Sequence, residues 1–325
     1  MSYERLRKFA EAQKLRQASL ALTEQVSGQL SKDYAIALVK LGDLARKRGA
    51  LQESRDYYNK ALALGDRPEA FSALINLGRD AFHGTVNLRG ALSAAANDVA
   101  LAYRSMVGLE VNSTGQRQSM LSDPAKALEY LTRARNVANN GNDLGTALTW
   151  MAVVRQTQPD GAAEADSLYR GAMAAENTDS AEQALTLEFY ARFLKTQDRE
   201  AEAAPIEARA KAIRQTRVSK MGPKQVAPAS AVRVGHGVTA PTLAYKVEPE
   251  YSEEARAAKL QGTVLLKVVI DVDGLAKDIE VMHGQGLGLD EQAVAAIMRW
   301  KFNPGQKDGA PVPVQAQIEI NFKLL

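Results

Sequence analysis

The chain has 325 residues, more than one small hydrophobic core usually organises, so its length predicts about two domains or a repeat array. Its 41 basic and 38 acidic side chains leave a net charge of +3, which is too weak over this length to attract nucleic acid. The absence of cysteine excludes disulfides, thiolate metal sites and cysteine nucleophiles.

The beginning of the chain, residues 1–17, carries charges every few positions. It has no apolar core of the kind that a signal peptide or a membrane anchor needs. No later stretch reaches the roughly 18 apolar residues of a spanning helix. We therefore expect no membrane span in this chain.

Residues 1–213 are predicted to form an all-helical domain, because apolar residues recur there at helical spacing. Within it, residues 35–68 contain glycine for a tight turn between two helices, and the second helix places Ser54, Tyr58 and Ala61 on one face. This arrangement resembles the tetratricopeptide repeat, a pair of packed helices. A helical bundle rich in alanine is the alternative.

The pattern of that second helix recurs along the domain. It returns as Ala127, Leu131 and Ala134, then as Ala165, Tyr169 and Ala172, and last as Ala203 and Ala210, with Glu207 in the aromatic position. The two later spacings are 38 residues each, whereas the spacing from Ala61 to Ala134 is 73 residues, about two repeats. We therefore expect a degenerate repeat over residues 67–105, followed by an exposed loop over 108–124.

Residues 214–240 are predicted to be a basic flexible linker. Helical periodicity stops there, and glycine and proline interrupt the segment. It carries five basic residues and no acidic residue. The folded parts on either side are expected to reorient freely unless the linker docks on one of them.

Residues 241–325 change to the alternating pattern of strands. Apolar side chains alternate from Val264 to Val272, and Asp273 with Gly274 predicts a hairpin turn because both residues tolerate positive φ. Residues 312–324 alternate over their whole length, so a last strand buries one face.

Two helices complete this C-terminal domain. Ser252 is placed to cap a short helix before the first strand, and Asp290 is placed to cap a helix that runs to about Trp300. The order αββαβ predicts a small α+β domain, a three-stranded antiparallel sheet with helices on one face. The chain as a whole is thus predicted to be multidomain.

Several short motifs of this domain occur in an order that resembles the TonB C-terminal domain family. They are Pro249-Glu250-Tyr251-Ser252, Ala255-Arg256, Gly262 before alternating valines, Asp273-Gly274, Leu289-Asp290 and Trp300-Lys301-Phe302-Asn303-Pro304. The resemblance covers residues 241–325. It implies a binding module in which an extended partner peptide pairs with the last strand.

This resemblance places a peptide-binding site on the last strand and on the segment before the first helix. Physical reasoning agrees, because an edge strand exposes unpaired N–H and C=O groups. Pro311 and Pro313 are expected to blunt the start of the strand and leave its later part available. The candidate residues are Glu248, Glu250, Tyr251, Val314, Gln315, Gln317, Glu319, Asn321 and Lys323. The two glutamates depart from the uncharged polar side chains that the family often carries.

We expect no enzyme, cofactor site or metal site. His83, His236 and His283 fall in the helical region, the linker and the sheet domain, with no pair at helical spacing. His283 is interpreted as a solvated residue at a strand end, and Trp300 as a core residue whose N–H needs one partner.

The sequence thus predicts a non-catalytic adaptor of the cell envelope, in which a repeat groove binds one protein and the strand edge binds a peptide, such as the N-terminus of an outer-membrane protein. One alternative is a self-assembling envelope protein that forms a homodimer through the same edge. Another is an accessory protein of TonB-type energy transduction or transport. A periplasmic location follows from the family resemblance alone.

Overall fold

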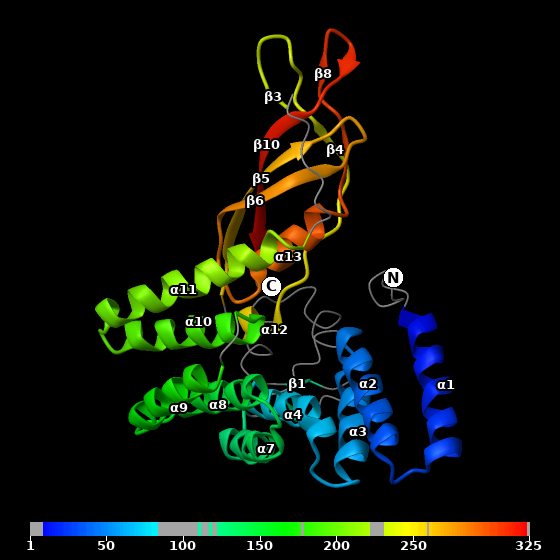
Figure 1. Cartoon of the computed structure of the whole chain (residues 1–325), viewed down its shortest axis with the longest axis vertical. Coiled ribbons are helices and arrows are strands. Elements are labelled where there is room, and N and C mark those ends of the chain that lie inside the picture. The colour runs from blue at the N-terminus through cyan, green and yellow to red at the C-terminus, as the bar shows by residue number, and fades with distance from the viewer. Residues whose placement is uncertain are drawn as a thin grey trace. The chain divides into compact units, whose positions relative to one another are not determined.

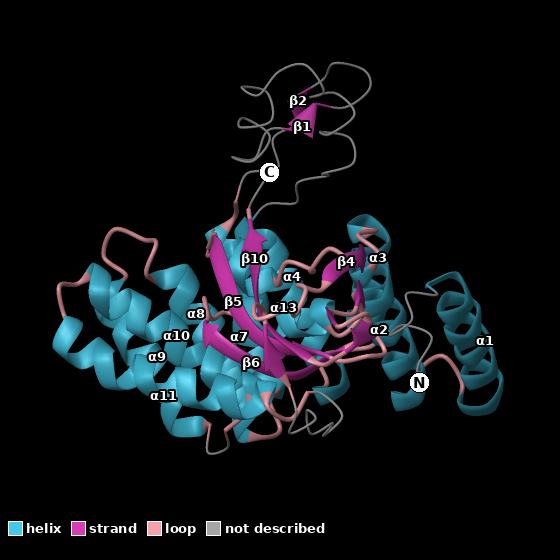
Figure 2. Ribbon diagram, turned by 90° about the horizontal axis from the view of Figure 1, so that it is seen from above, coloured by secondary structure: helices cyan, strands magenta, loops and turns pink. Residues whose placement is uncertain are grey.

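The computed structural model describes residues 9–83, 110–111, 117–118, 122–176, 179–221, 231–258 and 260–323. The chain divides into two compact units, Met1–Asn177 and Thr178–Leu325. The strands β3 to β10 belong to the second unit. Figure 1 labels most of the elements, and Figure 2 shows the neighbouring strands β10, β5 and β6. As predicted, a helical repeat region precedes a small α+β domain.

The first unit consists of helices that pack largely as consecutive pairs. Ser31, Asp123 and Asn140 begin three of them, and each side chain accepts a hydrogen bond from the backbone N–H three residues later. The pairs are α2 with α3, α4 with α7, and α8 with α9. The bounds are α1 Phe9–Ser27, α2 Lys32–Lys47, α3 Leu51–Leu62, a 3₁₀ turn Pro68–Ala70, α4 Phe71–His83, α7 Pro124–Val137, α8 Gly141–Arg155 and α9 Ala162–Ala175.

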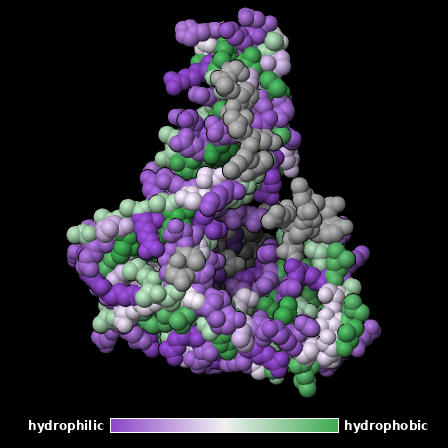
Figure 3. All heavy atoms as spheres, viewed as in Figure 1, coloured by the Kyte–Doolittle hydropathy of each residue, from purple (hydrophilic) through white to green (hydrophobic). Residues whose placement is uncertain are grey.

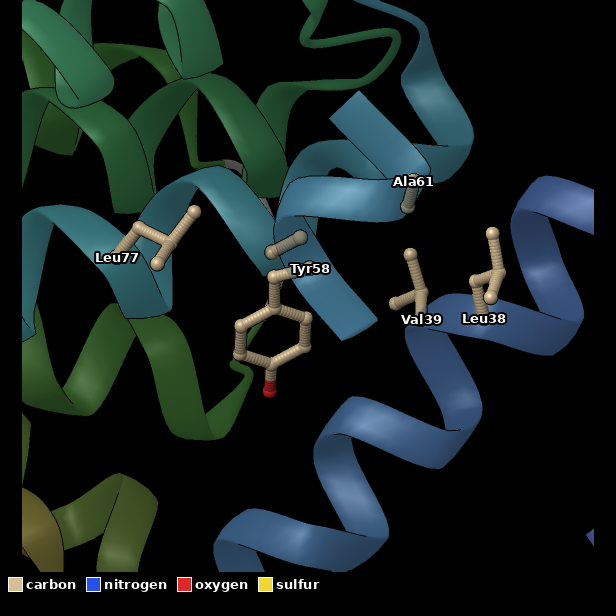
Figure 4. Packing of buried hydrophobic residues seen from close by; sticks show 6 residues of the cluster. Leu38, Val39, Tyr58, Ala61 and Leu77 are labelled. Atoms are coloured by element: carbon tan, nitrogen blue, oxygen red, sulfur yellow. The ribbon is translucent and has the colours of Figure 1, made fainter. Parts of the chain in front are cut away.

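The repeated residue triplets lie inside these pairs, as the repeat interpretation requires. In α3, Ser54, Tyr58 and Ala61 are fully buried. Figure 4 shows Tyr58 and Ala61 packing with Leu38 and Val39 of α2 and Leu77 of α4. The equivalent triplets of α7 and α9 are also buried, which confirms that one face of each second helix packs on its partner.

The 73-residue spacing between Ala61 and Ala134 has a different origin from the one expected. Helix α4 pairs with α7, and a Cβ added to Gly78 of α4 would lie 2.9 Å from Leu131 of α7, much as one added to Gly42 would meet Tyr58. The backbone N–H of Asp123 donates to the carbonyl of Ala81 over 2.7 Å, so the two helix ends are adjacent. One helix pair is therefore interrupted by residues 84–122.

This finding corrects the expected repeat over residues 67–105, because its first helix has its partner outside that range. Sequence spacing cannot distinguish an inserted segment from a further repeat of similar length. Residues 84–109 lie outside the described residues. Within the predicted loop over 108–124, β1 Glu110–Val111 and β2 Arg117–Gln118 pair antiparallel.

The second unit joins a helix pair to the C-terminal domain. Its sheet has the order β3-β10-β5-β6, in which β10 and β6 pair antiparallel with β5, and β3 pairs parallel with β10. The three antiparallel strands are as predicted, whereas β3 is an addition. The bounds are α10 Ala181–Thr196, α11 Glu200–Val218, β3 Val232–Arg233, β4 Thr242–Tyr245, α12 Glu253–Ala257, β5 Gly262–Ile270, β6 Ala276–His283, α13 Leu289–Ile297, β7 Lys301–Asn303, β8 Gln306–Lys307, β9 Ala310–Pro311 and β10 Val314–Phe322.

The register of the central strands follows from the alternation of their side chains. Strand β10 pairs with β5 without a shift, from Val314 opposite Ile270 to Phe322 opposite Gly262. Val264, Leu266 and Val268 of β5 are fully buried, and α13 packs on β5 and β6. Each large apolar side chain contributes about 1.5–3 kcal/mol on burial, and a one-residue slip would expose the whole set.

The hairpin between β5 and β6 differs in detail from the expected two-residue turn. The backbone N–H of Asp271 donates to the Leu275 carbonyl over 3.0 Å, so the loop between them has three residues. Of these, only Gly274 has positive φ, at 73°. A Cβ there would lie 2.2 Å from the Phe302 carbonyl oxygen, so the position requires glycine for space as well as for conformation.

One of the two predicted helix caps is confirmed. The Ser252 hydroxyl accepts a hydrogen bond from the Ala255 N–H over 3.1 Å at the start of α12. For α13, however, the capping position is Gly288, with φ of 84°. Asp290 instead lies buried in the first turn, where its carboxylate accepts the Gln285 N–H over 2.8 Å and organises the preceding loop. Burial raises the pKa of Asp290.

The segment predicted as a flexible linker is docked at both of its ends. Helix α11 continues through Val218, and Arg214 and Val218 are buried. At the other end, Val232 and Arg233 form β3, and Thr239 is hydrogen-bonded to Gln306. The predicted boundary after residue 213 thus lies inside a helix whose far end packs against α13 and β6. Residues 222–230 lie outside the described residues.

Two features concern the hydropathy of the helices and of the visible surface. Among the described residues, none of the helices is long and apolar enough to span a membrane. On the face shown in Figure 3, hydrophilic and hydrophobic residues are interspersed.

Candidate functional site

The candidate site is the edge of the sheet formed by β10. Residues Ala316–Phe322 pair with β5 on one side, and no described strand pairs with them on the other. These seven residues form an edge of about 24 Å, at about 3.4 Å per residue. The uninterrupted register with β5 keeps this edge regular.

The orientation of the peptide groups on this edge follows from one hydrogen bond. The N–H of Val232 in β3 donates to the Pro313 carbonyl over 2.9 Å, so the Pro313 carbonyl faces the edge side of β10. Peptide groups alternate in direction along a strand, which places those of Gln315, Gln317, Glu319 and Asn321 on the same side. These four residues, which follow one another at every second position, are all predicted site residues. Their backbone N–H and C=O groups face the edge side of β10.

Their side chains divide into two groups. Gln317, Glu319 and Asn321 are exposed, and the Thr263 hydroxyl of β5 donates to the Asn321 side-chain oxygen over 2.5 Å. Lys323, directly after β10, is also exposed. By contrast, Val314 is fully buried and Gln315 is half-buried, and both pair with β3 as well as with β5.

The structure brings Tyr251 to the far end of the same strand. Its ring lies 5.6 Å from that of Phe322 in an edge-to-face arrangement, and its hydroxyl donates to the Leu260 carbonyl. Burial raises the pKa of the Tyr251 phenol. The preceding segment is held by Trp300, which is buried as predicted and whose Nε1–H donates to the Val247 carbonyl over 2.7 Å.

Glu248 and Glu250 lie on the exposed side of this segment. Glu248 forms an ion pair with Lys246 at 2.7 Å, with most of its side chain in solvent. Their contribution to peptide binding stays a prediction.

The opposite edge of the sheet, β6, is less suited to strand addition. Its pairing with β5 shifts register at two places, and Asp278 within it has a φ of 48°. Exposed Asp278 and Glu280 add charge to the strand, and α11 packs against it. Irregular geometry and charge are features that discourage edge pairing.

The sequence interpretation missed two features near the site. Val232 and Arg233 of β3 occupy the start of the edge, and the alternation Val-Arg-Val at residues 232–234 is the signal that could have indicated a strand. The second feature is a buried ion-pair cluster that joins α10 and α11 to α13, and nothing in the sequence pattern identifies it.

That cluster is centred on Arg214 of α11. Its Nε and Nη2 donate to both carboxylate oxygens of Glu188 at 2.9 and 2.8 Å, and its Nη1 donates to Glu291 of α13 at 2.8 Å. Glu188 also accepts the backbone N–H of Leu287 at 2.9 Å. Burial alone would lower the pKa of Arg214, but the two glutamates raise it; burial raises the pKa of Glu188 against the opposing effect of Arg214.

The remaining candidates are metal-ligating side chains and the three histidines. In the part of the chain that the structure describes, no group of three or more suitable side chains could hold a metal ion. His83 ends α4, His236 lies in an exposed turn, and His283 is exposed at the end of β6, as its interpretation as a solvated strand-end residue requires.

Comparison with known proteins matches both parts of the chain. Residues 247–324 match the family described as Gram-negative bacterial TonB protein C-terminal, and residues 1–67 match a tetratricopeptide repeat family. Neither family contributes catalytic residues, and both bind proteins.

Curated relatives share only the C-terminal part. Protein TonB of Vibrio cholerae is 36% identical over 80 residues, which cover 24% of this chain and 33% of the relative. Protein tonB2 of Pseudomonas aeruginosa is 35% identical over 77 residues, which cover 23% of this chain and 28% of the relative. The chain thus spans about a third of the length of these relatives.

Among solved structures, BtubC (BKLC) from P. vanneervenii aligns with 71% of this chain and 82% of its own, at 14% identity and a TM-score of 0.43. The two family matches and the observed elements lead to one assignment: this chain carries a TonB C-terminal domain at residues 247–324, preceded by tetratricopeptide repeats.

Proposed function

We propose that this chain is a non-catalytic protein-binding adaptor of the cell envelope, and that its TonB C-terminal domain binds an extended peptide by strand addition to β10. The observation that carries the proposal is the regular edge at Ala316–Phe322, which has no described partner strand. The non-catalytic character of both matched families supports it.

The edge offers a defined set of hydrogen bonds. Gln317, Glu319 and Asn321 each present one N–H and one C=O outward, and each hydrogen bond made to a partner contributes about 1 kcal/mol net. Tyr251 lies beside the end of this row, where it can contact a side chain of the added strand. Main-chain bonds supply affinity in this mode, and neighbouring side chains supply selectivity.

The helical repeats provide a second binding surface in this proposal. Stacked helix pairs present extended surfaces to protein partners, and three such pairs lie in the described part of the first unit. The peptide that adds to β10 is proposed to come from the N-terminus of an outer-membrane protein, and the chain is proposed to act in the periplasm. Both statements derive from the similarity to TonB proteins.

Proline substitutions test strand addition directly. The full chain is used to select peptides from a phage-displayed library of twelve-residue sequences, and selected peptides are then measured on Gln317→Pro and Glu319→Pro. Because proline has no N–H and places its ring at the edge, we expect affinity to fall at least about tenfold. Circular dichroism and thermal unfolding verify that each variant is folded.

Gln317→Ala and Glu319→Ala serve as matched controls. They remove the same side chains and keep the backbone N–H, so affinity should stay within about twofold. Equal binding by the folded proline variants and the wild-type chain would show that the peptides do not add to β10.

Self-assembly is a second candidate function, because the same regular edge can pair with β10 of another copy. Light scattering on the full chain distinguishes the two. A dimer mass that becomes monomeric in Gln317→Pro supports self-pairing, whereas a monomer leaves the edge to a peptide. A role as an accessory in TonB-type energy transduction is compatible with the peptide-binding mode and is tested by the identity of the captured partner.

A further inference from the structure

The start of the β10 edge is already occupied by the chain itself. Strand β3 pairs parallel with β10, with Val232 opposite Val314 and Arg233 opposite Gln315. The Val232 N–H donates to the Pro313 carbonyl over 2.9 Å. Residues 232–233 precede the matched TonB domain, which begins at residue 247, so this strand lies outside the matched family domain.

Strand β3 is anchored by contacts beyond its own pairing. After a turn at Gly235–Val238, Val238 forms a bridge with Lys307, and the Thr239 N–H donates to the Gln306 carbonyl over 2.8 Å. The Gln306 N–H in turn donates to the Thr239 hydroxyl over 2.8 Å. The segment is thus fixed to the domain on both sides of the turn.

This arrangement divides the outward peptide groups of β10 in two. The Pro313 carbonyl is used by the Val232 N–H, and proline has no N–H to offer. The Val232 carbonyl lies on the same side as its N–H and therefore faces the N–H of Gln315. The groups of Gln317, Glu319 and Asn321 remain. The usable edge therefore begins directly where β3 ends.

We propose that β3 is a built-in stop that sets the register of the added strand. A partner peptide then pairs only opposite Ala316–Phe322, in a segment of about seven residues without proline at the three positions that bond to Gln317, Glu319 and Asn321. Val232 is the register-determining residue, because its N–H holds β3 on the edge. This proposal rests on the proposed strand addition and specifies its register.

The first experiment examines the free chain. Residue-resolved amide exchange by NMR should show a protected Gln315 N–H, and rapid exchange at Gln317, Glu319 and Asn321. Val232→Pro removes the anchoring donor and should expose Gln315 to exchange. Arg233→Pro is the matched control. The N–H of Arg233 points away from β10, so its loss should leave the Gln315 N–H protected. Equal protection of Gln315 in both variants and the wild-type chain would overturn the role of Val232.

The second experiment measures the register with a nested series of synthetic peptides of five, seven, nine and eleven residues, derived from the library selection. On the wild-type chain, affinity should rise up to about seven residues and then change by less than about twofold. On Val232→Pro, extension to nine residues should tighten binding by about fivefold or more, because two further hydrogen bonds become available. Arg233→Pro should behave as the wild-type chain.

The outcomes separate this proposal from the proposed function. In one outcome, peptides protect the amides of Gln317, Glu319 and Asn321, and longer peptides also displace β3 in the wild-type chain. In that case strand addition is supported, and the proposal that β3 sets the register is wrong. If bound peptides protect none of these amides, or the selection yields no peptide, both proposals fail together.

Discussion

At the scale of single residues, two glycines allow the helix pairs of the first unit to close. A Cβ added to Gly42 would lie 2.4 Å from the Tyr58 ring and 3.2 Å from the Ser54 carbonyl oxygen. A Cβ added to Gly78 would lie 2.9 Å from the Leu131 side chain and 3.4 Å from the Ala127 carbonyl oxygen. The two sites are equivalent, which is direct structural evidence that α4 and α7 form one interrupted pair.

We expect Gly42→Ala and Gly78→Ala to lower the free energy of unfolding by about 1–3 kcal/mol, because the extra methyl group must displace packed side chains. Gly171→Ala in α9 is the control. Its Cβ would lie 3.5 Å from Leu148, an ordinary contact, so the higher helix propensity of alanine should leave stability unchanged or raise it by up to about 1 kcal/mol. Urea unfolding measures all three, and similar values for the three variants would contradict the close approach.

At the scale of elements, the Arg214 cluster joins the C-terminal domain to α10 and α11. Arg214 and Glu188 are almost fully buried, with side chains 7% and 11% exposed, and Glu291 is 15% exposed. An ion pair at this depth offsets its own desolvation only when all partners are present. The cluster holds α10 and α11 against α13 in a single arrangement.

Removal of the arginine should therefore be costly. We expect Arg214→Ala to destabilise the second unit by about 3–5 kcal/mol, because Glu188 is left as a buried charge. Arg217→Ala is the matched control on the same helix: Arg217 is 41% exposed and 4.0 Å from Glu291, so its loss should cost less than about 1 kcal/mol. Hydrogen exchange in β6 and α13 reports the loss, and equal exchange in the two variants would contradict a structural role for the cluster.

At the scale of the whole molecule, the chain comprises two compact units, and the second is larger than the matched TonB domain. It includes α10 and α11, which by sequence pattern belong with the repeats. The sequence places the domain boundary at residue 241, whereas α11 packs on α13 and β6 of the C-terminal domain. We therefore expect residues 241–325 alone to be less stable than the whole second unit.

A pair of fragments tests it. Residues 178–325 retain the Arg214 cluster and the packing of α11 on α13 and β6, whereas residues 241–325 lose both. We expect the shorter fragment to unfold at a Tm lower by more than about 5 °C, since 1 kcal/mol shifts the Tm of a domain of this size by about 4–8 °C. Equal Tm values would show that the TonB domain is equally stable alone and that contact with α10 and α11 does not stabilise it.

Much of the fold was predictable because its signals are local. The buried triplet of α3, the alternation of β10 and the Ser252 cap are each written in a short stretch of sequence, and the structure confirms all three. The candidate strand was predictable for the same reason. The prediction of an Asp290 cap was wrong, because a carboxylate near a helix start can bond to the preceding loop instead. Asp290 is buried and accepts its hydrogen bond from the Gln285 N–H of that loop.

By itself, then, the sequence determined the helical type of the repeat region, the three long strands of the C-terminal sheet, the faces that these elements bury and the family of the C-terminal domain. Only the tertiary structure decided that α4 pairs with α7 across an insertion, that Arg214 joins α11 to α13, and that Val232 occupies the start of the β10 edge. The physical reason is that periodicity records which side of an element avoids water, whereas pairing between distant segments depends on shape, buried charge and free backbone groups that meet only after folding.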